Sequence, residues 1–324
     1  MGSATGVREG VYRSALARRV TRWLEALPHP PMACEIAPGY VAAARWTRGG
    51  AGLDGFAVEP LPPGAIVPSA VETNLANAEA IRAAVGRVFA RLRAKGQEVA
   101  LFVPDPVVRV FVLHFDEFPR AASEAIPMLR WKLKKSVPFE QEETLVSYMR
   151  QAPRDEGVDI VTGLARLRIV REYEMLAQSA GMHPGVVMSS TLATLSLLDD
   201  QRPTLLARIS GTTLTTAIVR EGVLCGYRCT ELPTDVSRLT PQGLLDEIYP
   251  VAAYYQDTWS EGIQAVRLAG LAERTEEFRH PLGEELRCPV GALLASAALE
   301  GRISDDARPL ADRQLDALVG WMLN

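Results

Sequence analysis

The chain has 324 residues, of which 48% are hydrophobic and 23% charged, and its formal net charge is -4. These proportions are typical of a folded globular protein and exclude a disordered or fibrous chain. The negative charge argues against a nucleic-acid-binding protein, because such proteins normally carry a basic domain or stripe. A chain of this length is expected to form two or more domains.

Cysteine usage and hydropathy predict a cytoplasmic protein. The four cysteines are scattered, without the paired spacing of a disulfide framework or a zinc site. No apolar run approaches the ~20 residues that a membrane-spanning helix needs. The chain also lacks a Walker A loop, a G-x-G-x-x-G turn and a G-x-S-x-G elbow. We therefore predict no catalytic residue and no metal ligand.

The first predicted element is a basic amphipathic helix over residues 11–27. Apolar residues recur there at helical spacing, and arginines occupy the remaining face. Such a helix can lie on an anionic membrane at the inner face of the cell membrane. The residues predicted to touch lipid are Arg18, Arg19, Arg22 and Trp23. Packing against the protein's own body is an equal alternative, and a proline-rich linker follows.

The two halves of the chain then repeat one order of predicted elements. In each half, three strands form a meander and a helix follows. The first set is expected at residues 32–36, 40–46, 56–61 and 81–92, and the second at 205–209, 214–220, 223–230 and 244–259. Because the order repeats while the sequence does not, we predict two duplicated α/β lobes that face each other across a cleft. This is the plan of the actin-like, or ribonuclease H-like, fold.

A smaller unit of strands around one helix is predicted between the lobes, as an inserted α+β subdomain. The predicted division is a helix and linker at 1–31, a first lobe at 32–97 plus 159–200, the inserted subdomain at 98–158, and a second lobe at 201–324.

Two segments carry a resemblance to a known family. Residues 124–151 contain a helix that leads into Pro-Phe, acidic residues and a strand, with Trp131, Pro138, Phe139, Glu142, Glu143 and Tyr148 at the matching positions. Residues 164–184 follow with a strand, a helix and a Gly-Met-x-Pro exit. Together with the order of the lobes, this pattern resembles the PilM family of type IV pilus assembly proteins, which is related to FtsA, over nearly all of residues 32–324.

The resemblance implies a partner and a location. PilM-like proteins are cytoplasmic scaffolds that bind the short N-terminal tail of PilN, an inner-membrane protein, and link it to the pilus motor ATPases. The residues predicted to contact the tail are Trp131, Lys134, Lys135, Pro138 and Phe139. A core stripe with a solvated lysine face is the alternative interpretation of this helix.

The resemblance also raises the question of ATP. Actin-like proteins hold ATP and magnesium between the lobes, on two hairpin turns and an adenosine-side turn. The corresponding residues are Glu35, Gly39, Gly211, Thr212, Thr213 and Gly270. Arg208 stands where relatives have an aspartate, and a guanidinium cannot ligate magnesium. Only residues from about 230 to about 262 remain for a fourth subdomain, which we therefore predict to be reduced or missing.

We favour a scaffold without a cofactor, and two alternatives stay open. The first is an ATP-binding switch or weak ATPase of the same fold. The second is a cytoplasmic actin-like module related to the type II secretion protein GspL. The sequence does not predict the oligomeric state.

Overall fold

The computed structural model describes residues 29–47, 52–152, 157–198, 201–295, 299 and 301–323. Among them are three β-sheets, two of five strands and one of three. The predicted N-terminal helix, with Arg18, Arg19, Arg22 and Trp23, lies outside the described residues. Within the described part of the chain, no helix combines the length and hydrophobicity needed to cross a membrane.

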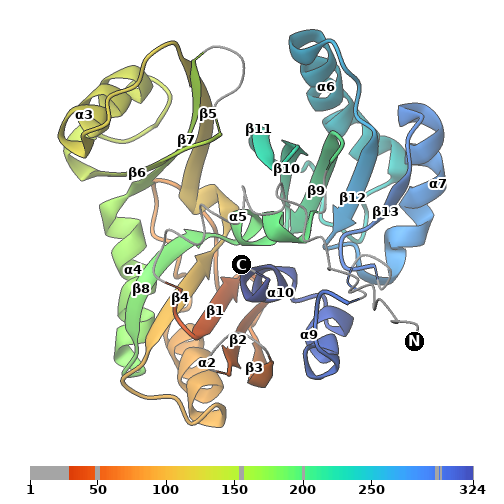
Figure 1. The fold of residues 1–324 in the computed structure, drawn as a ribbon. Helices are drawn as coiled ribbons and strands as arrows, with labels where there is room; N and C mark the ends of the chain where they lie inside the picture. Colours follow the sequence, from red (N-terminus) through yellow and green to blue (C-terminus); the bar gives the residue numbers. More distant parts are fainter. Residues whose placement is uncertain are drawn as a thin grey trace, which may run out of the picture.

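The first lobe is built on a five-stranded sheet with the order β3-β2-β1-β4-β8. Its strands are β1 (Met32–Ala37), β2 (Tyr40–Trp46), β3 (Leu53–Pro60), β4 (Glu98–Val103) and β8 (His183–Ser189). The first three form an antiparallel meander, and β4 and β8 run parallel to β1. Helices α2 (Ala78–Arg91) and α4 (Leu167–Ser179) cover one face (Figure 1).

The second lobe repeats this sheet with the order β11-β10-β9-β12-β13. Its strands are β9 (Thr204–Ser210), β10 (Thr213–Arg220), β11 (Val223–Glu231), β12 (Ala265–Ala269) and β13 (Val290–Ala292). Again a meander comes first and two parallel strands complete the sheet. The outer face carries α6 (Pro241–Trp259) and α7 (Thr275–Leu286). The two sheets thus have one topology, and the predicted actin-like fold is confirmed.

The small subdomain stands above the first lobe in Figure 1. Its antiparallel sheet has the order β5-β7-β6, with β5 (Val108–Phe115), β6 (Thr144–Arg150) and β7 (Val158–Arg166). Helix α3 (Ala122–Leu133) packs on it through Ala125 and Leu129, which share a core with Phe118 and Ile160. The segment between β11 and β12 contains one helix, α6. The predicted boundaries of the lobes and the inserted subdomain stay a prediction.

The described residues also form short helical elements. They are η1 (Asp105–Val107), η2 (Gln141–Glu143), α5 (Ser190–Thr194), η3 (Leu195–Leu197), η4 (Ala272–Arg274), η5 (Asp305–Ala307), α9 (Arg308–Asp312) and α10 (Asp316–Met322). Figure 1 shows α5 and α10 between the two large sheets. Trp321 of α10 is fully buried and packs edge-on against Phe102 of β4.

Side chains alternate between the two faces of a strand, so the first strand of each large sheet determines which residues face the junction between the two lobes. Met32, Cys34 and Ile36 of β1 belong to the core beneath α2 and α4, so Ala33 and Glu35 point to the opposite face. In β9, Leu205, Ala207 and Ile209 belong to the core beneath α6 and α7. Leu206 and Arg208 therefore point to the junction. One core spans this junction, because Ala33 and Leu206 belong to the same cluster of buried residues.

Candidate functional site

The two lobes meet through equivalent positions of their first hairpins. Each hairpin has a two-residue loop, Pro38-Gly39 between β1 and β2 and Gly211-Thr212 between β9 and β10. A Cβ added to Gly211 would lie 3.7 Å from both Cβ and Cγ of Pro38, which is ordinary van der Waals contact. The two loop tips therefore touch.

Glu35 and Arg208 stand three residues before Pro38 and Gly211 respectively, and they form an ion pair across the junction. Arg208 Nη2 lies 2.8 Å from Glu35 Oε1. Glu35 is fully buried and Arg208 is 5% exposed. The second oxygen of Glu35 accepts a hydrogen bond of 2.9 Å from the hydroxyl of Tyr40.

Asp316, in the first turn of α10, makes the most extensive contact with Arg208. Its two oxygens accept from Nε at 2.8 Å and from Nη2 at 2.9 Å, which is the bidentate geometry favoured by guanidinium and carboxylate. Oδ1 also accepts from the backbone N–H of Ala317. The C-terminal helix thereby reaches the same junction as the two hairpins.

Asp105 is the third carboxylate around the guanidinium, with Oδ2 at 3.7 Å from Arg208 Nη1. It lies two residues after the end of β4 and accepts hydrogen bonds from both lobes. Within the first lobe, Thr191 donates through its N–H at 2.9 Å and its hydroxyl at 2.6 Å. From the second lobe, the hydroxyls of Thr215 and Tyr227 donate at 2.9 and 3.1 Å. These bonds stabilise the buried carboxylate of Asp105, which shares the one guanidinium of Arg208 with Glu35 and Asp316.

Burial shapes the protonation of this cluster. It raises the pKa of Glu35, and the nearby Arg208 opposes that rise. Burial alone would lower the pKa of Arg208, but Asp316 and Glu35 raise it well above its ordinary value. The pKa values of Tyr40 and Tyr227 are also raised, mainly by burial, so both hydroxyls keep the protons that they donate. The cluster therefore holds a permanent cation and neutral hydroxyl donors.

These residues do not fit a magnesium–nucleotide. Magnesium needs free oxygen ligands, whereas Glu35 and Asp316 are bound to Arg208. Pro38 has no N–H to offer a phosphate, and its ring fills the space beside Gly211. Among the described residues, no three His, Cys, Asp or Glu side chains are arranged to hold a metal ion.

The other predicted nucleotide residues have different surroundings. Gly39, Gly211 and Thr212 are exposed at the hairpin tips, whereas Thr213 is buried at the start of β10. Gly270 has a φ of +81°, and a Cβ there would lie 1.8 Å from the carbonyl oxygen of Ile209. Close packing of the chain against β9 therefore accounts for this glycine.

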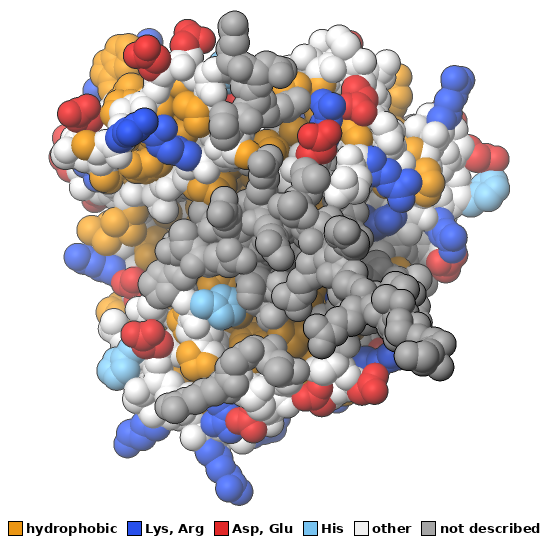
Figure 2. All heavy atoms as spheres, in the orientation of Figure 1, with side chains coloured by type: hydrophobic (Ala, Val, Ile, Leu, Met, Phe, Trp, Pro, Cys, Tyr) orange, Lys and Arg blue, Asp and Glu red, His pale blue; other side chains and the backbone are white. Residues whose placement is uncertain are grey.

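The predicted partner-binding residues lie together at the end of α3, far from the junction. Trp131 is 78% exposed, and Lys134, Lys135 and Pro138 are exposed beside it, whereas Phe139 is half-buried. Neither Lys134 nor Lys135 forms an ion pair with a residue that the structure describes. Strand β6 forms one edge of the small sheet and exposes Leu145. Figure 2 shows basic side chains beside hydrophobic ones over this upper left part of the molecule.

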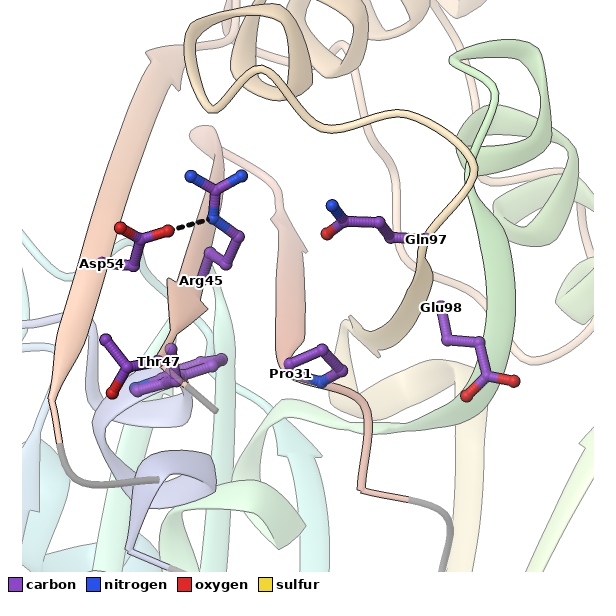
Figure 3. Close-up of a pocket in the computed structure, with 7 residues that line it drawn as sticks. Pro31, Arg45, Thr47, Asp54, Gln97 and Glu98 are labelled. Atoms are coloured by element: carbon purple, nitrogen blue, oxygen red, sulfur yellow. Dashed lines mark hydrogen bonds and ion pairs between the residues drawn. The ribbon is translucent and has the colours of Figure 1, made fainter. Parts of the chain in front are cut away.

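A hollow of about 620 Å³ lies at the opposite end of β1 and β2 from the hairpin tip. Figure 3 shows its lining, in which Arg45 and Asp54 form an ion pair of 2.5 Å. Trp46, the last residue of β2, also lines it. Its buried indole N–H has no hydrogen-bond partner among the described residues. The remaining residues of the lining are Pro31, Thr47, Gln97 and Glu98.

Sequence comparison identifies no relative: no protein-family model and no curated protein matches the chain. Structural comparison finds proteins with a similar fold. A chain of a PilM–PilN type IV pilus biogenesis complex matches with a TM-score of 0.70 and 16% identity, over 91% of this chain and 98% of that chain. A Bacteroides thetaiotaomicron protein of unknown function with an actin-like ATPase fold matches with a TM-score of 0.48 and 12% identity, over 87% of this chain and 95% of that chain. The cytoplasmic domain of EpsL from the Vibrio cholerae type II secretion system matches with a TM-score of 0.46 and 14% identity, over 82% of this chain and 98% of that chain.

The chain therefore has an actin-like fold, and its predicted resemblance to PilM is confirmed at the level of the fold. The sequence placed Glu35 and Arg208 in the two hairpins and identified Arg208 as the residue that departs from the relatives. It did not identify Asp105 or Asp316, which complete the cluster. A signal existed for Asp105, because a polar residue just beyond the end of a buried parallel strand often lies at a functional edge of the sheet.

Proposed function

We propose that this protein is a cytoplasmic scaffold of a type IV pilus machine and that it binds the N-terminal tail of a PilN-like membrane protein. The observation that carries the proposal is the whole-chain match to a chain of the PilM–PilN complex. The Arg208 cluster favours a scaffold over an ATP-binding switch, because the carboxylates that could hold a metal are bound to Arg208.

The end of α3 and the neighbouring strand β6 are the proposed binding surface. An extended peptide can pair with the free edge of β6 and place alternate side chains against the sheet and helix. Trp131 offers a large aromatic surface, and exposed aromatic residues are frequent binding hot spots. Lys134 and Lys135 would attract an acidic or carboxylate-bearing tail.

In this proposal the scaffold links the captured tail to the cytoplasmic pilus motor ATPases. Contact with the inner face of the membrane would come from Arg18, Arg19, Arg22 and Trp23. Co-sedimentation with anionic liposomes tests this part, by comparing the full chain with a chain that starts at Met32. Equal pelleting of the two would contradict the membrane contact.

The tail-binding surface is tested by titrating the protein with a synthetic N-terminal tail of the PilN-like protein from the same organism. We expect Trp131→Ala to weaken binding by about tenfold or more, with an unchanged melting temperature. The matched control is Tyr254→Ala, which removes another exposed aromatic side chain, 72% exposed, from α6 of the second lobe. Equal weakening by both variants would contradict the assignment of the surface, and no binding by the wild type would contradict the function.

A further inference from the structure

We infer that Arg208 is a built-in cation that holds the two lobes together without a ligand. In nucleotide-binding proteins of this fold, a metal–nucleotide lies between the lobes. Here the guanidinium lies between the two equivalent hairpins instead, and it is bound by carboxylates rather than by phosphates. This inference concerns the junction alone and does not depend on the partner proposed above.

The bonds of the cluster cross the junction in both directions. Arg208 of the second lobe is bound to Glu35 of the first. Asp105 of the first lobe accepts from Thr215 and Tyr227 of the second. Separating the lobes would break all of these bonds together. It would also leave buried carboxylates without their donors, unless water replaced them.

Arg208 is the element on which the cluster depends. It is the cation that contacts Glu35, Asp105 and Asp316, and its side chain is 5% exposed. Without it, three carboxylates would face one another around an opening of guanidinium size. Their repulsion would favour separation of the lobes, because charges in a poorly solvated site interact strongly. A lysine would keep the charge but not the bidentate geometry on Asp316.

The contact between Pro38 and Gly211 supplies a direct reporter of lobe closure. A Cβ at Gly211 lies 3.7 Å from Cβ of Pro38, within the range of a disulfide bond. The double variant Pro38→Cys/Gly211→Cys should therefore form an intramolecular disulfide under mild oxidation when the lobes are closed. The control pair is Ala37→Cys/Gly211→Cys, because among the described residues Pro38 has the only Cβ that lies within 4 Å of a Cβ at Gly211.

We expect the Pro38/Gly211 pair to cross-link readily in the absence of nucleotide, and Mg-ATP to change its rate less than about twofold. Adding Arg208→Ala should slow the cross-link at least about tenfold, because it leaves the buried carboxylates unpaired. Guanidinium at a sub-denaturing concentration should restore much of the rate, and sodium chloride of equal ionic strength should not. Arg208→Lys should give an intermediate rate, and it serves as the readout if Arg208→Ala fails to fold.

Two results would overturn the inference. The first is a cross-link in the native-arginine background that forms only when Mg-ATP is added. The second is an unchanged rate in a folded Arg208→Ala or Arg208→Lys variant.

Discussion

Gln151 and Leu224 are joined by two hydrogen bonds, although 73 residues separate them in the chain. The side-chain amide of Gln151 donates to the carbonyl oxygen of Leu224 and accepts from its N–H, each at 2.8 Å. Gln151 follows β6 of the small subdomain, and Leu224 is in β11 of the second lobe. One buried side chain thus fixes the small subdomain against the second lobe.

Replacing Gln151 by alanine would leave the N–H and carbonyl of Leu224 without these partners. Each unsatisfied buried group costs about 1–3 kcal/mol, so we expect Gln151→Ala to lower the free energy of unfolding by about 2 kcal/mol or more. Urea denaturation measures this loss. The control is Gln242→Ala, because Gln242 is exposed and its amide bonds to Asp246 at the surface. Equal midpoints for the two variants would contradict the role of Gln151.

Two helical glycines should respond to alanine in opposite directions. A Cβ at Gly320 of α10 would lie 2.1 Å from the carbonyl oxygen of Ala193 in α5, so Gly320→Ala must push these two helices apart. We expect it to cost about 1–3 kcal/mol or more. Gly86 of α2 has no atom within 4 Å of the added Cβ. Gly86→Ala should therefore stabilise the protein by about 0.5–1 kcal/mol.

Thermal or urea unfolding of both glycine variants tests this pair. Stabilisation by Gly320→Ala, or an equal loss in both, would show that α5 and α10 do not pack as closely as the structure indicates.

The pH dependence of stability tests the protonation of Glu35. Because burial raises its pKa, the folded protein binds this proton more tightly than the unfolded chain does. The stability linked to the proton is present at acid pH and is lost as the pH rises through the folded pKa. Glu35→Gln has no such proton. The wild type should therefore gain stability relative to Glu35→Gln between about pH 8 and about pH 5.

Urea midpoints of the wild type and Glu35→Gln at the two pH values measure this difference. A relative gain by the wild type at the higher pH would contradict a raised pKa. It would indicate instead that Arg208 outweighs burial and lowers the pKa of Glu35.

Local patterns predicted most of the fold, because the forces that form strands and hairpins here are local. Tyr40 and Trp46 bound β2 as predicted, and Pro38-Gly39 forms the predicted turn. The second turn was predicted over residues 211–213 and is one residue shorter, because Thr213 already belongs to β10. The duplicated order of elements predicted the common sheet topology. The unusual Arg208 also indicated an altered nucleotide site.

The junction itself could not be predicted, because it depends on contacts between distant residues. Asp316 lies 108 residues from Arg208, and Asp105 lies 110 from Thr215. Gly270 was interpreted as a nucleotide-side glycine, whereas its close approach to Ile209 depends on the pairing of β12 with β9. Such roles follow from the packing of the lobes.

The scaffold and the built-in cation are tested together by calorimetric titration of the wild-type protein with the PilN-like tail peptide, with and without Mg-ATP. We expect the peptide to bind with the same affinity in both conditions, because Arg208 holds the lobes together and no nucleotide is needed. Binding that appears only with Mg-ATP would contradict the built-in cation. No binding in either condition would contradict the proposed scaffold.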